Sequence, residues 1–223
     1  MPNFNQPLVS IITVVFNNDE YIRDAIESVL SQDYSRIEHI VIDGGSTDGT
    51  IDIIKEYSDK ISVFLSEPDE GIFDALNKGI IRSHGEIIGI LHSDDLFCDK
   101  YVISDVINKM KVTETELCFS DLVIVDALSG KLVRYYMAHY FRRWMLRIGW
   151  LPPHPTVFLK RAIFDEFGLY SKNYQIAGDF EFFVRIFYGR QIKWSYLNRI
   201  SVMMRRGGAS NSGLKSIKLA ISE

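Results

Sequence analysis

The sequence has little cysteine and no long apolar segment. Its two cysteines, Cys98 and Cys118, are too few in 223 residues for a disulfide framework or a cysteine metal cage. No run of about 18 apolar residues occurs, so no transmembrane helix is expected. Residues 1–7 are polar and carry no signal-peptide pattern. These absences predict a cytoplasmic protein in a reducing compartment.

The signatures of several enzyme classes are also missing. The sequence contains no G-x-G-x-x-G, which is typical of dinucleotide-binding folds, and no G-x-S-x-G or H-E-x-x-H, which are typical of common hydrolases. Gly44 and Gly49 have the spacing of a P-loop, but Thr50 stands where that loop requires lysine. This glycine turn is therefore either a phosphate-binding turn of another kind or an ordinary start of a helix.

Acidic residues are scarce in the second half of the chain. The formal net charge of −4 combines −15 over residues 1–126, with 9 basic and 24 acidic residues, and +11 over residues 127–223, with 16 basic and 5 acidic residues. No acidic residue occurs over residues 127–164 or 182–222. This asymmetry indicates either two functional surfaces or two solvated faces of opposite charge.

Strand and helix patterns alternate through the first half. The expected strands cover residues 8–16, 37–42, 61–65 and 87–91. The expected helices cover about residues 19–31, 51–57 and 72–82. This alternation predicts an α/β protein with βαβ units and a mainly parallel sheet, which binds ligands beyond the carboxyl ends of its strands.

The second half has a mixed pattern. A hairpin is expected from residues 117–125 and 131–136, a short strand over 156–159 and a helix over 179–188. The chain has no repeat, no low-complexity segment and no flexible linker between its halves. With 47% hydrophobic residues it has enough apolar surface for one folded domain.

Three carboxylates fall where strands are expected to end. Asp43 closes the second strand, and Asp94 and Asp95 follow the fourth. Adjacent carboxylates repel each other unless a cation or a proton relieves the repulsion. Mg²⁺ and Mn²⁺ are cations that take one or two carboxylates together with phosphate oxygens. A helix cap or a solvated turn is the alternative for the Asp94–Asp95 pair.

A series of short motifs follows the chain in a characteristic order. They are residues 10–17 (SIITVVFN), Gln32 ahead of Glu38, residues 41–50 (VIDGGSTDGT), 71–79 (GIFDALNKG), 85–88 (GEII), 93–95 (SDD), 154–158 (HPTVF) and 177–183 (AGDFEFF). Through them, over about residues 8–210, the chain resembles family 2 glycosyltransferases of the bacterial surface-polysaccharide type. The resemblance implies the GT-A fold, with a Rossmann-like, mainly parallel central sheet flanked by helices and a mixed α+β acceptor region.

The resemblance also implies how the chain is divided and which residues have functional roles. A single domain would span residues 1–223, with a nucleotide-sugar donor half at about 8–126 and an acceptor half with a C-terminal tail at about 127–223. The residues assigned to the nucleotide-sugar are Thr13, Val15, Asn17, Glu20, Asp43, Lys78 and Asp94. Asp43 would accept a hydrogen bond from uracil N3–H, and Asp95 would ligate a Mn²⁺ or Mg²⁺ ion that bridges the diphosphate. Asp179 would be the catalytic base, with Glu181 as the alternative.

The sequence departs from the family at a position that commonly contacts pyrophosphate. Many relatives carry an arginine three residues before Gly79, where this chain has Leu76. We therefore expect the pyrophosphate contacts to come from Lys78, or from Arg205 and Arg206.

An aromatic and basic segment occupies residues 134–150. Within it Phe141, Trp144, Met145 and Ile148 have helical spacing and are bordered by Arg142, Arg143 and Arg147. A basic amphipathic helix of this kind suits an anionic lipid interface at the inner face of the cell membrane, or a groove for a lipid-diphosphate-linked acceptor. A helix that packs on the core with solvated arginines is the alternative.

Two further features belong to the acceptor half. His154 lies between prolines and is a candidate for the acceptor side or for phosphate binding, with a structural loop histidine as the alternative. Residues 207–210 are interpreted either as a mobile lid that orders on donor binding or as a simple loop.

The resemblance implies an inverting, metal-dependent hexosyl- or N-acetylhexosaminyl-transferase. It would move a sugar from a nucleotide-sugar, foremost a UDP-sugar, to a hydroxyl of a glycan or lipid-linked acceptor in bacterial polysaccharide synthesis. One alternative is a nucleotidyltransferase on a related fold, but Asn17 and Asn18 stand where such enzymes carry a basic glycine-rich loop. The other is a non-catalytic nucleic-acid-binding protein that uses the basic half, which the overall pI of 5.8 disfavours.

Overall fold

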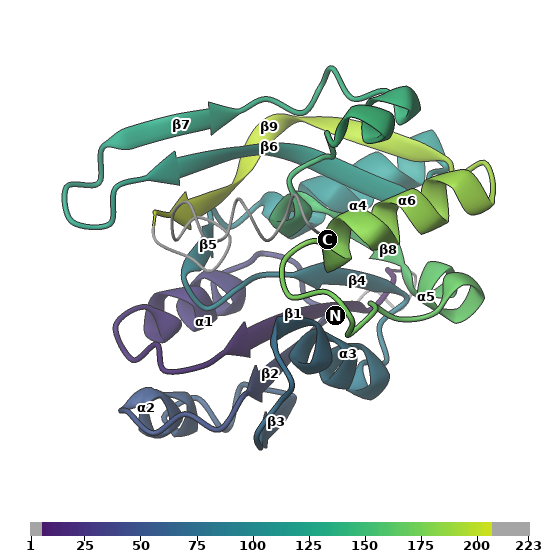
Figure 1. Ribbon diagram of the computed structural model, residues 1–223. Helices are drawn as coiled ribbons and strands as arrows, with labels where there is room; N and C mark the ends of the chain where they lie inside the picture. The colour runs from purple at the N-terminus through teal and green to yellow at the C-terminus, as the bar shows by residue number, and fades with distance from the viewer. Residues whose placement is uncertain (1–5, 207–223) are drawn as a thin grey trace.

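A curved sheet of nine strands runs through residues 6–206, the part of the chain that this computed structural model describes (Figure 1). The strands are β1 (Val9–Val15), β2 (Ile37–Asp43), β3 (Val63–Ser66), β4 (Ile87–Ile90), β5 (Asp95–Phe97), β6 (Leu117–Val125), β7 (Leu132–Tyr136), β8 (Phe158–Lys160) and β9 (Trp194–Arg205). The helices are α1 (Ile22–Leu30), α2 (Thr50–Lys55), α3 (Ile72–Arg82), α4 (Val102–Thr113), α5 (Arg161–Phe167) and α6 (Gly178–Gly189), with short 3-10 turns η1 (Arg143–Ile148) and η2 (His154–Thr156).

The strand order is β3-β2-β1-β4-β8-β6-β9-β5, with β7 beside β6. The four strands β3, β2, β1 and β4 are parallel, so their carboxyl ends lie at one edge. Strand β8 joins this group to β6 through antiparallel pairing on both sides. The α/β class and the mainly parallel sheet predicted from the sequence are confirmed.

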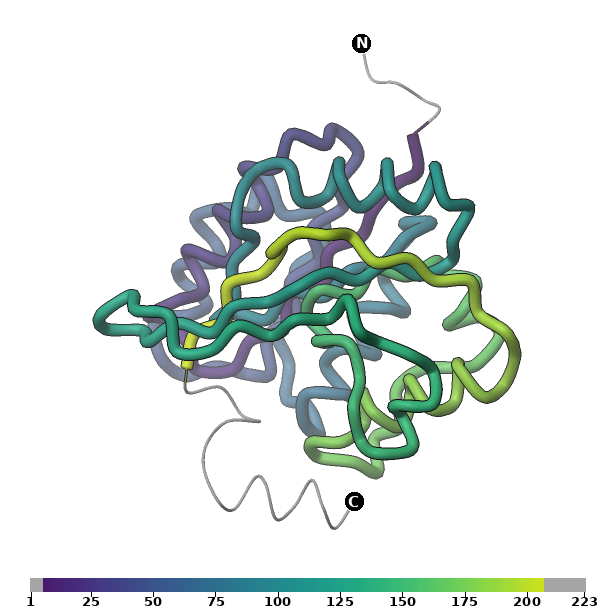
Figure 2. The backbone as a smooth tube through the Cα atoms, turned by 90° about the horizontal axis from the view of Figure 1, so that it is seen from above, coloured from purple at the N-terminus to yellow at the C-terminus, as the bar shows by residue number. Residues whose placement is uncertain are grey.

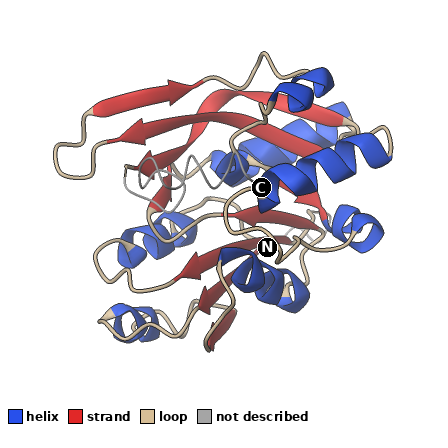
Figure 3. Ribbon diagram, in the orientation of Figure 1, coloured by secondary structure: helices blue, strands red, loops and turns tan. Residues whose placement is uncertain are grey.

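Helices cover both faces of the sheet (Figure 3). Strand β1 shows why, because all seven of its residues are buried. Ile12 and Val14 pack in the core beneath α3, α5 and α6, whereas Val9 and Ile11 pack on the opposite face, which α1 and α4 cover. A strand buried on both faces reads as a continuous apolar run, which explains its clear sequence signal.

The second half contains elements that the sequence patterns did not indicate. Helix α4 and the 12-residue strand β9 were not expected. Strand β9 pairs parallel to β6 and antiparallel to β5, where Asp95 lies opposite Met204. This pairing brings the last described residues of the chain beside the turn that follows β4.

The amphipathic helix expected over residues 134–150 is wrong. Arg134 belongs to β7, which pairs with β6, and η1 is a 3-10 turn of six residues. Phe141, expected on the apolar stripe of that helix, is instead a fully buried core residue. Pairing with β6 and burial of Phe141 outweigh the local helical periodicity of this segment.

Two sequence-based expectations concern the ends of the chain and the membrane. The lid or loop expected at residues 207–210 lies outside the described residues. From residue 6 to residue 206, no helix combines the length and the apolar character needed to cross a bilayer.

Candidate active site

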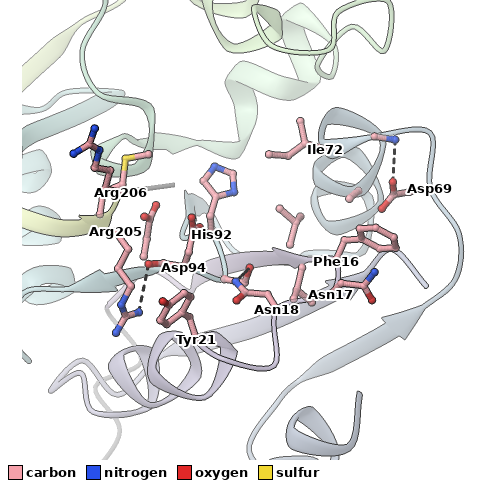
Figure 4. A pocket seen from close by; sticks show the side chains of 17 residues that line it. Phe16, Asn17, Asn18, Tyr21, Asp69, Ile72, His92, Asp94, Arg205 and Arg206 are labelled. Atoms are coloured by element: carbon pink, nitrogen blue, oxygen red, sulfur yellow. Dashed lines mark hydrogen bonds between the residues drawn. The ribbon is translucent and has the colours of Figure 1, made fainter. Parts of the chain in front are cut away.

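A cavity of about 550 Å³ opens at the carboxyl ends of β1 and β4 (Figure 4). Its lining comes from four segments: the end of β1 and the loop after it, the start of α3 and the loop before it, the turn after β4, and the end of β9 with the residue after it. The lining residues are Val14, Val15, Phe16, Asn17, Asn18, Tyr21, Asp69, Gly71, Ile72, Ala75, His92, Ser93, Asp94, Asp95, Met204, Arg205 and Arg206. The position matches the strand-end location at which α/β sheets bind ligands.

The loop after β1 is held by side chains from the neighbouring loops. Asn17 has φ 48°, in the left-handed region that asparagine tolerates. Its N–H donates to Ser46 Oγ at 2.8 Å, and its Oδ1 accepts from the N–H of Thr47 at 2.8 Å. The Asn18 amide donates to Ser93 Oγ at 2.8 Å. The β1, β2 and β4 loops are therefore fixed relative to one another before any ligand binds.

Asp43 lies buried at the end of β2, behind the cavity wall. Its Oδ2 accepts hydrogen bonds from the N–H of Gly45 at 3.1 Å, the N–H of Ser46 at 3.0 Å and Ser66 Oγ at 2.7 Å. Its Oδ1 is buried and has no hydrogen-bond partner within the described part of the chain. Asp43 is therefore a rigidly held carboxylate whose Oδ1 is available as an acceptor.

Gly44, next to Asp43, allows two cavity residues to lie over the end of β2. A Cβ at Gly44 would clash with Asp69 Oδ2 and would meet the Phe16 ring at 3.4 Å. Phe16 itself is 62% exposed, although it directly follows a fully buried strand. An exposed aromatic ring beside the strand ends offers a flat apolar surface to a ligand.

Asp95 is the buried member of the Asp94–Asp95 pair. Among residues 6–206 neither oxygen of its carboxylate has a hydrogen-bond partner. Burial, together with the negative charge of Asp94, raises the pKa of Asp95 well above its ordinary value. An unpartnered buried carboxylate is costly, and a bound cation would remove that cost.

The donor set at this position fits Mg²⁺ or Mn²⁺ better than a closed protein metal site. Within the described ranges no group of three or more His, Cys, Asp or Glu side chains is placed to hold a metal. Mg²⁺ commonly takes one or two carboxylates and completes its coordination with phosphate oxygens and water. The Asp94–Asp95 pair therefore fits a metal that arrives with a diphosphate.

Arg205 provides the positive charge beside this pair. Its guanidinium donates to Asp24 at 2.5 Å and to the backbone oxygen of Asp94 at 3.4 Å, and it lies 4.5 Å from the centre of the Tyr21 ring. Figure 4 shows Arg205 and Tyr21 on one side of the cavity and Asp69 and Ile72 on the other. The arginine is held in place by these contacts at the wall that carries Asp94.

Lys78, the other candidate for pyrophosphate contacts, points elsewhere. Its ammonium pairs with Glu67 at 3.0 Å and Asp74 at 3.4 Å and donates to the backbone oxygen of Pro68 at 2.9 Å. It does not line the cavity. Of the two possibilities drawn from the sequence, the structure brings Arg205 and Arg206 to the cavity.

A smaller cavity of about 90 Å³ adjoins the first and shares Ile72 and His92 with it. Asp179, in the first turn of α6, lines this cavity. Its Oδ1 accepts from the N–H of Phe180 at 2.7 Å. Burial raises the pKa of Asp179 to about 6. The carboxylate is therefore ionised at neutral pH but more basic than an exposed aspartate.

Two histidines flank Asp179 in this small cavity. Burial lowers the pKa of both His92 and His154 to about 4, so both rings are neutral at neutral pH. His154 Nε2 lies 2.8 Å from the Tyr170 hydroxyl. Asp179 is consequently the one charged group among the side chains that line the small cavity.

The structure brings most, but not all, of the sequence-predicted site residues together. Val15, Asn17, Asp94 and Asp95 line the large cavity, and Asp179 and His154 line the small one. The residues that line neither cavity are Thr13, Glu20, Asp43, Lys78 and Glu181.

The contacts of Thr13 and Glu181 account for their positions. Thr13 Oγ1 is buried in the sheet, 3.0 Å from His39 Nε2. Glu181 pairs with Arg185 at 2.8 Å. Neither side chain is therefore directed at a cavity.

Sequence reasoning missed Phe16, Tyr21 and Asp69 as cavity residues. The sequence does contain a signal for Phe16. It directly follows the apolar run of a strand and precedes the Asn17–Asn18 loop, which is an unusual, solvent-facing position for an aromatic ring. Tyr21 and Asp69 carry no local signal, since their placement depends on how separate loops meet.

The profile for Glycosyl transferase family 2 matches residues 10–168, which include the Asp94–Asp95 pair but not Asp179, Arg205 or Arg206. The chain belongs to glycosyl transferase family 2. This family 2 glycosyltransferase is 32% identical over 185 residues to an uncharacterized glycosyltransferase of Mycobacterium tuberculosis, a match that covers 80% of the chain and 68% of the relative. It is 41% identical over 93 residues to TuaG of Bacillus subtilis, covering 40% of the chain and 37% of TuaG, whose name assigns it provisionally to teichuronic acid biosynthesis.

Solved structures with similar folds come from more distant proteins. S. aureus TarS 1-349 in complex with UDP-GlcNAc superposes with a TM-score of 0.73 at 19% identity, covering 92% of this family 2 glycosyltransferase and 60% of that chain. The mannosyltransferase PcManGT of Pyrobaculum calidifontis, in complex with GDP-Man and Mn²⁺, gives a TM-score of 0.69 at 17% identity, covering 95% and 61%. The chain thus spans less than two thirds of these solved proteins. At such identities the likeness establishes the fold, and the predicted GT-A architecture is confirmed.

Proposed function

We propose that this family 2 glycosyltransferase moves a sugar from a nucleotide-sugar, preferably a UDP-sugar, to a hydroxyl of a glycan or lipid-linked acceptor with inversion of the anomeric carbon. One observation carries the proposal. The cavity that holds Asp95 and Arg205 adjoins the cavity that holds Asp179, and the two share Ile72 and His92. A leaving diphosphate and a base for the acceptor would then occupy separate, neighbouring cavities.

The nucleoside would occupy the part of the large cavity near β2. Phe16 offers an exposed ring for stacking, and Asp43 Oδ1 is an acceptor without a partner among residues 6–206. A uracil N3–H is a donor that would satisfy this oxygen, which requires the wall between the cavity and Asp43 to open as the nucleoside binds. TarS binds UDP-GlcNAc and PcManGT binds GDP-Man, so both nucleotides belong in the test.

The diphosphate would lie between Asp95 and Arg205. Asp95, with Asp94 beside it, would hold a divalent metal, which supplies Lewis-acid stabilisation of the departing phosphate oxygens. Arg205 adds a fixed positive charge that Asp24 and Tyr21 hold in position. Charged donors that are oriented before the reaction lose little energy in reorganising around the leaving group.

Asp179 would accept the proton of the attacking hydroxyl. As the acceptor oxygen bonds to the anomeric carbon, the bond from that carbon to the diphosphate oxygen breaks, and the hydroxyl proton moves to the carboxylate. A pKa of about 6 suits this role, because general bases act best when their pKa lies near the working pH. His92 and His154 are less basic, with pKa values of about 4. One displacement of this kind inverts the anomeric configuration.

The biological setting we propose is bacterial surface-polysaccharide synthesis. It is supported by the match to TuaG, which covers 40% of the chain. The transferred group would be a hexose or an N-acetylhexosamine. A panel of nucleotide-sugars decides whether the transferred group is a hexose or an N-acetylhexosamine.

Thermal unfolding with UDP-, GDP-, dTDP- and CMP-sugars, each with and without Mn²⁺, tests the donor and the metal together. A ligand at 100 times its dissociation constant stabilises the folded state by about 2.7 kcal/mol. We expect a UDP-sugar to raise Tm only when Mn²⁺ is present, and Asp95→Asn to lose this shift. Glu86→Gln, an exposed carboxylate beside the amino end of β4, is the matched control and should keep the shift.

The product completes the test. NMR of the anomeric proton should show a configuration opposite to that of the donor sugar. A retained configuration would contradict the single displacement at Asp179. A shift with GDP-sugars alone would contradict the uridine preference, and no shift with any nucleotide would contradict the proposed donor site.

A further inference from the structure

A short turn on the acceptor side combines exposed apolar side chains with arginines. We call it the arginine turn and define it by Arg142, Arg143, Trp144, Arg147 and Ile148. Trp144 is 55% exposed and Ile148 is 69% exposed. In a 3-10 turn the side chains at i and i+3 lie above each other, which places Trp144 next to Arg147 on η1. Apolar and cationic groups therefore share one small outer surface.

Buried residues in and beside the arginine turn, and not its exposed ones, attach it to the rest of the protein. Phe141 and Leu146 are buried, and the Phe141 ring lies 5.3 Å from those of Phe187 and Trp194. Figure 2 shows the segment leaving β7 and looping toward α6. Because the anchors point inward, Trp144 and Ile148 are not needed to hold the turn, and their exposure to water is unfavourable in the isolated molecule.

The charges of the arginine turn are not neutralised within the chain as described. Arg142 donates to the backbone oxygen of Phe141 at 2.8 Å, Arg143 lies 4.8 Å from the centre of the Tyr188 ring, and Arg147 donates to the Tyr188 hydroxyl at 3.2 Å. None of the three forms an ion pair with a carboxylate of residues 6–206. The sequence around them, residues 127–164, contains no acidic residue at all.

Several other arginines of this protein have carboxylate partners. Arg185 pairs with Glu181, Arg190 with Glu116 and Glu166, and Arg205 with Asp24. The partly buried Arg161 instead donates to the backbone oxygens of Gly85 and Ser83. The guanidinium charges of the arginine turn have no carboxylate among residues 6–206, so they are available to an anion from outside the chain.

We propose that the arginine turn binds the surface of an anionic lipid bilayer. Tryptophan prefers the interface between headgroups and acyl chains, and Ile148 beside it adds apolar area that the bilayer would bury. The arginines would contact lipid phosphates at the same depth. A second copy of this chain is a poorer partner, because a two-fold contact would set arginines against arginines.

The turn is rigidly connected to the proposed base. Arg143 and Arg147 both stack on Tyr188, at 4.8 and 5.9 Å from its ring centre. Tyr188 and Asp179 belong to the same helix, α6, nine residues apart, which corresponds to about 14 Å along the axis. Resting on the proposed transferase function, this places Asp179 within reach of the sugar of a lipid-linked acceptor held in the bilayer.

Flotation with lipid vesicles tests the proposal without any sugar donor. The protein should float with vesicles of phosphatidylglycerol and phosphatidylcholine, not with phosphatidylcholine alone, and binding should weaken as salt rises from 0.1 to 0.5 M. Each arginine near an anionic surface contributes about fivefold to the partition coefficient. The triple variant Arg142→Gln, Arg143→Gln, Arg147→Gln should therefore lose roughly a hundred-fold.

A matched control comes from α4. The triple variant Lys100→Gln, Lys109→Gln, Lys111→Gln also removes three positive charges, from α4 and the turn before it, and none of these lysines lines either cavity. It should bind like the parent chain. Unchanged Tm values verify that both variants are folded.

Quenching by brominated lipid locates the contact. Trp144→Phe keeps an apolar ring and should still float, but it should lose most of the quenching of tryptophan fluorescence. Quenching equal to that of the parent chain would overturn the proposal, because another surface would then face the bilayer.

Four further outcomes would overturn the proposal. They are equal binding to neutral and anionic vesicles, no binding to either, a concentration-dependent dimer that the triple arginine variant abolishes, and tighter binding to a random single-stranded oligonucleotide than to vesicles. Because flotation contains no nucleotide-sugar, failure here leaves the donor-site test unaffected, and failure of that test leaves this one unaffected.

Discussion

Replacing Asp179 by asparagine is expected to slow turnover strongly and, at the same time, to stabilise the fold at neutral pH. Burial raises the pKa of Asp179 from an ordinary value of 3.8 to about 6. The fold therefore disfavours the ionised carboxylate that the proposed base requires. Asparagine has almost the same shape, and its Oδ1 can still accept the 2.7 Å hydrogen bond that Phe180 N–H donates to Asp179.

The size of the stabilisation follows from linkage between protonation and folding. The difference between a pKa of 3.8 unfolded and about 6 folded corresponds to about 3 kcal/mol. Between pH 4 and 6 the folded state binds more protons at Asp179 than the unfolded state, so this group lowers wild-type stability as the pH rises. The advantage of Asp179→Asn should thus be near zero below pH 4, about half its maximum at pH 5 and complete above pH 6.

Urea unfolding of both proteins at several pH values between 4 and 8, together with a donor-turnover assay at pH 7.5, measures the two effects. Turnover should fall by about 10²–10⁴-fold, the contribution typical of a general base. Near-normal turnover would refute the assignment of Asp179 as base. Equal or lower stability of the variant at pH 8 would refute the reasoning about its burial.

Glu181→Gln separates the two carboxylates of α6. Glu181 pairs with Arg185 at 2.8 Å and lines neither cavity. Its removal should lower stability by about 1 kcal/mol or less, since partly exposed ion pairs contribute little. Turnover should fall less than tenfold. A greater loss than in Asp179→Asn would transfer the role of base to Glu181.

Three other predictions use simpler measurements. In steady-state kinetics, kcat/KM should rise about tenfold per pH unit below pH 6 and level off above it, because Asp179 must be ionised; a flat profile from pH 5 to 8 would argue against this base. Arg205→Gln should weaken UDP binding in calorimetry by about tenfold or more while Lys78→Gln changes it little, since only Arg205 lines the cavity. Gly178→Ala should lower the free energy of unfolding by about 1–3 kcal/mol in urea titration, because the new Cβ would lie 2.7 Å from the Phe73 ring.

The first half of the fold was predictable because its signals are local. Strands β1 and β4 are buried on both faces and are mostly apolar, and β2 has the apolar stretch Ile40–Ile42 before Asp43. The turns that follow them carry Asn17 and the Asp94–Asp95 pair at the strand ends, where ligands of parallel sheets bind. Order along the chain was therefore enough to predict one edge of the sheet and part of its chemistry.

The second half was less predictable because its structure depends on pairing between distant segments. Strand β9 has no clean alternation of buried and exposed residues, and it forms by pairing with β6 and β5. Residues 134–150 have helical periodicity, yet β7 and the burial of Phe141 divide the segment into a strand and a 3-10 turn. Local propensity is a weak preference that tertiary contacts of this kind override.

The two candidates for the pyrophosphate contact show the same difference between local sequence signals and long-range pairing. Lys78 lies inside a family motif, but its neighbours Glu67 and Asp74 hold it away from the cavity. Arg205 is 110 residues beyond Asp95 in sequence, and the antiparallel pairing of β5 with β9 brings it to the cavity wall. No periodic pattern in the sequence indicates that Arg205 lies close to Asp95, because their proximity depends on strand pairing.

By itself, the sequence determined the α/β class, the family resemblance and the identity of the acidic side chains at the strand ends, because periodicity and residue chemistry are written along the chain. The tertiary structure alone decided three features of residues 6–206. Asp95 is buried without a hydrogen-bond partner, the cavity that Asp179 lines adjoins the cavity that Asp95 lines, and Arg142, Arg143 and Arg147 have no carboxylate partner. The burial and the charge pairing of a side chain depend on neighbours from many segments of the chain, and only the packed fold brings those neighbours together.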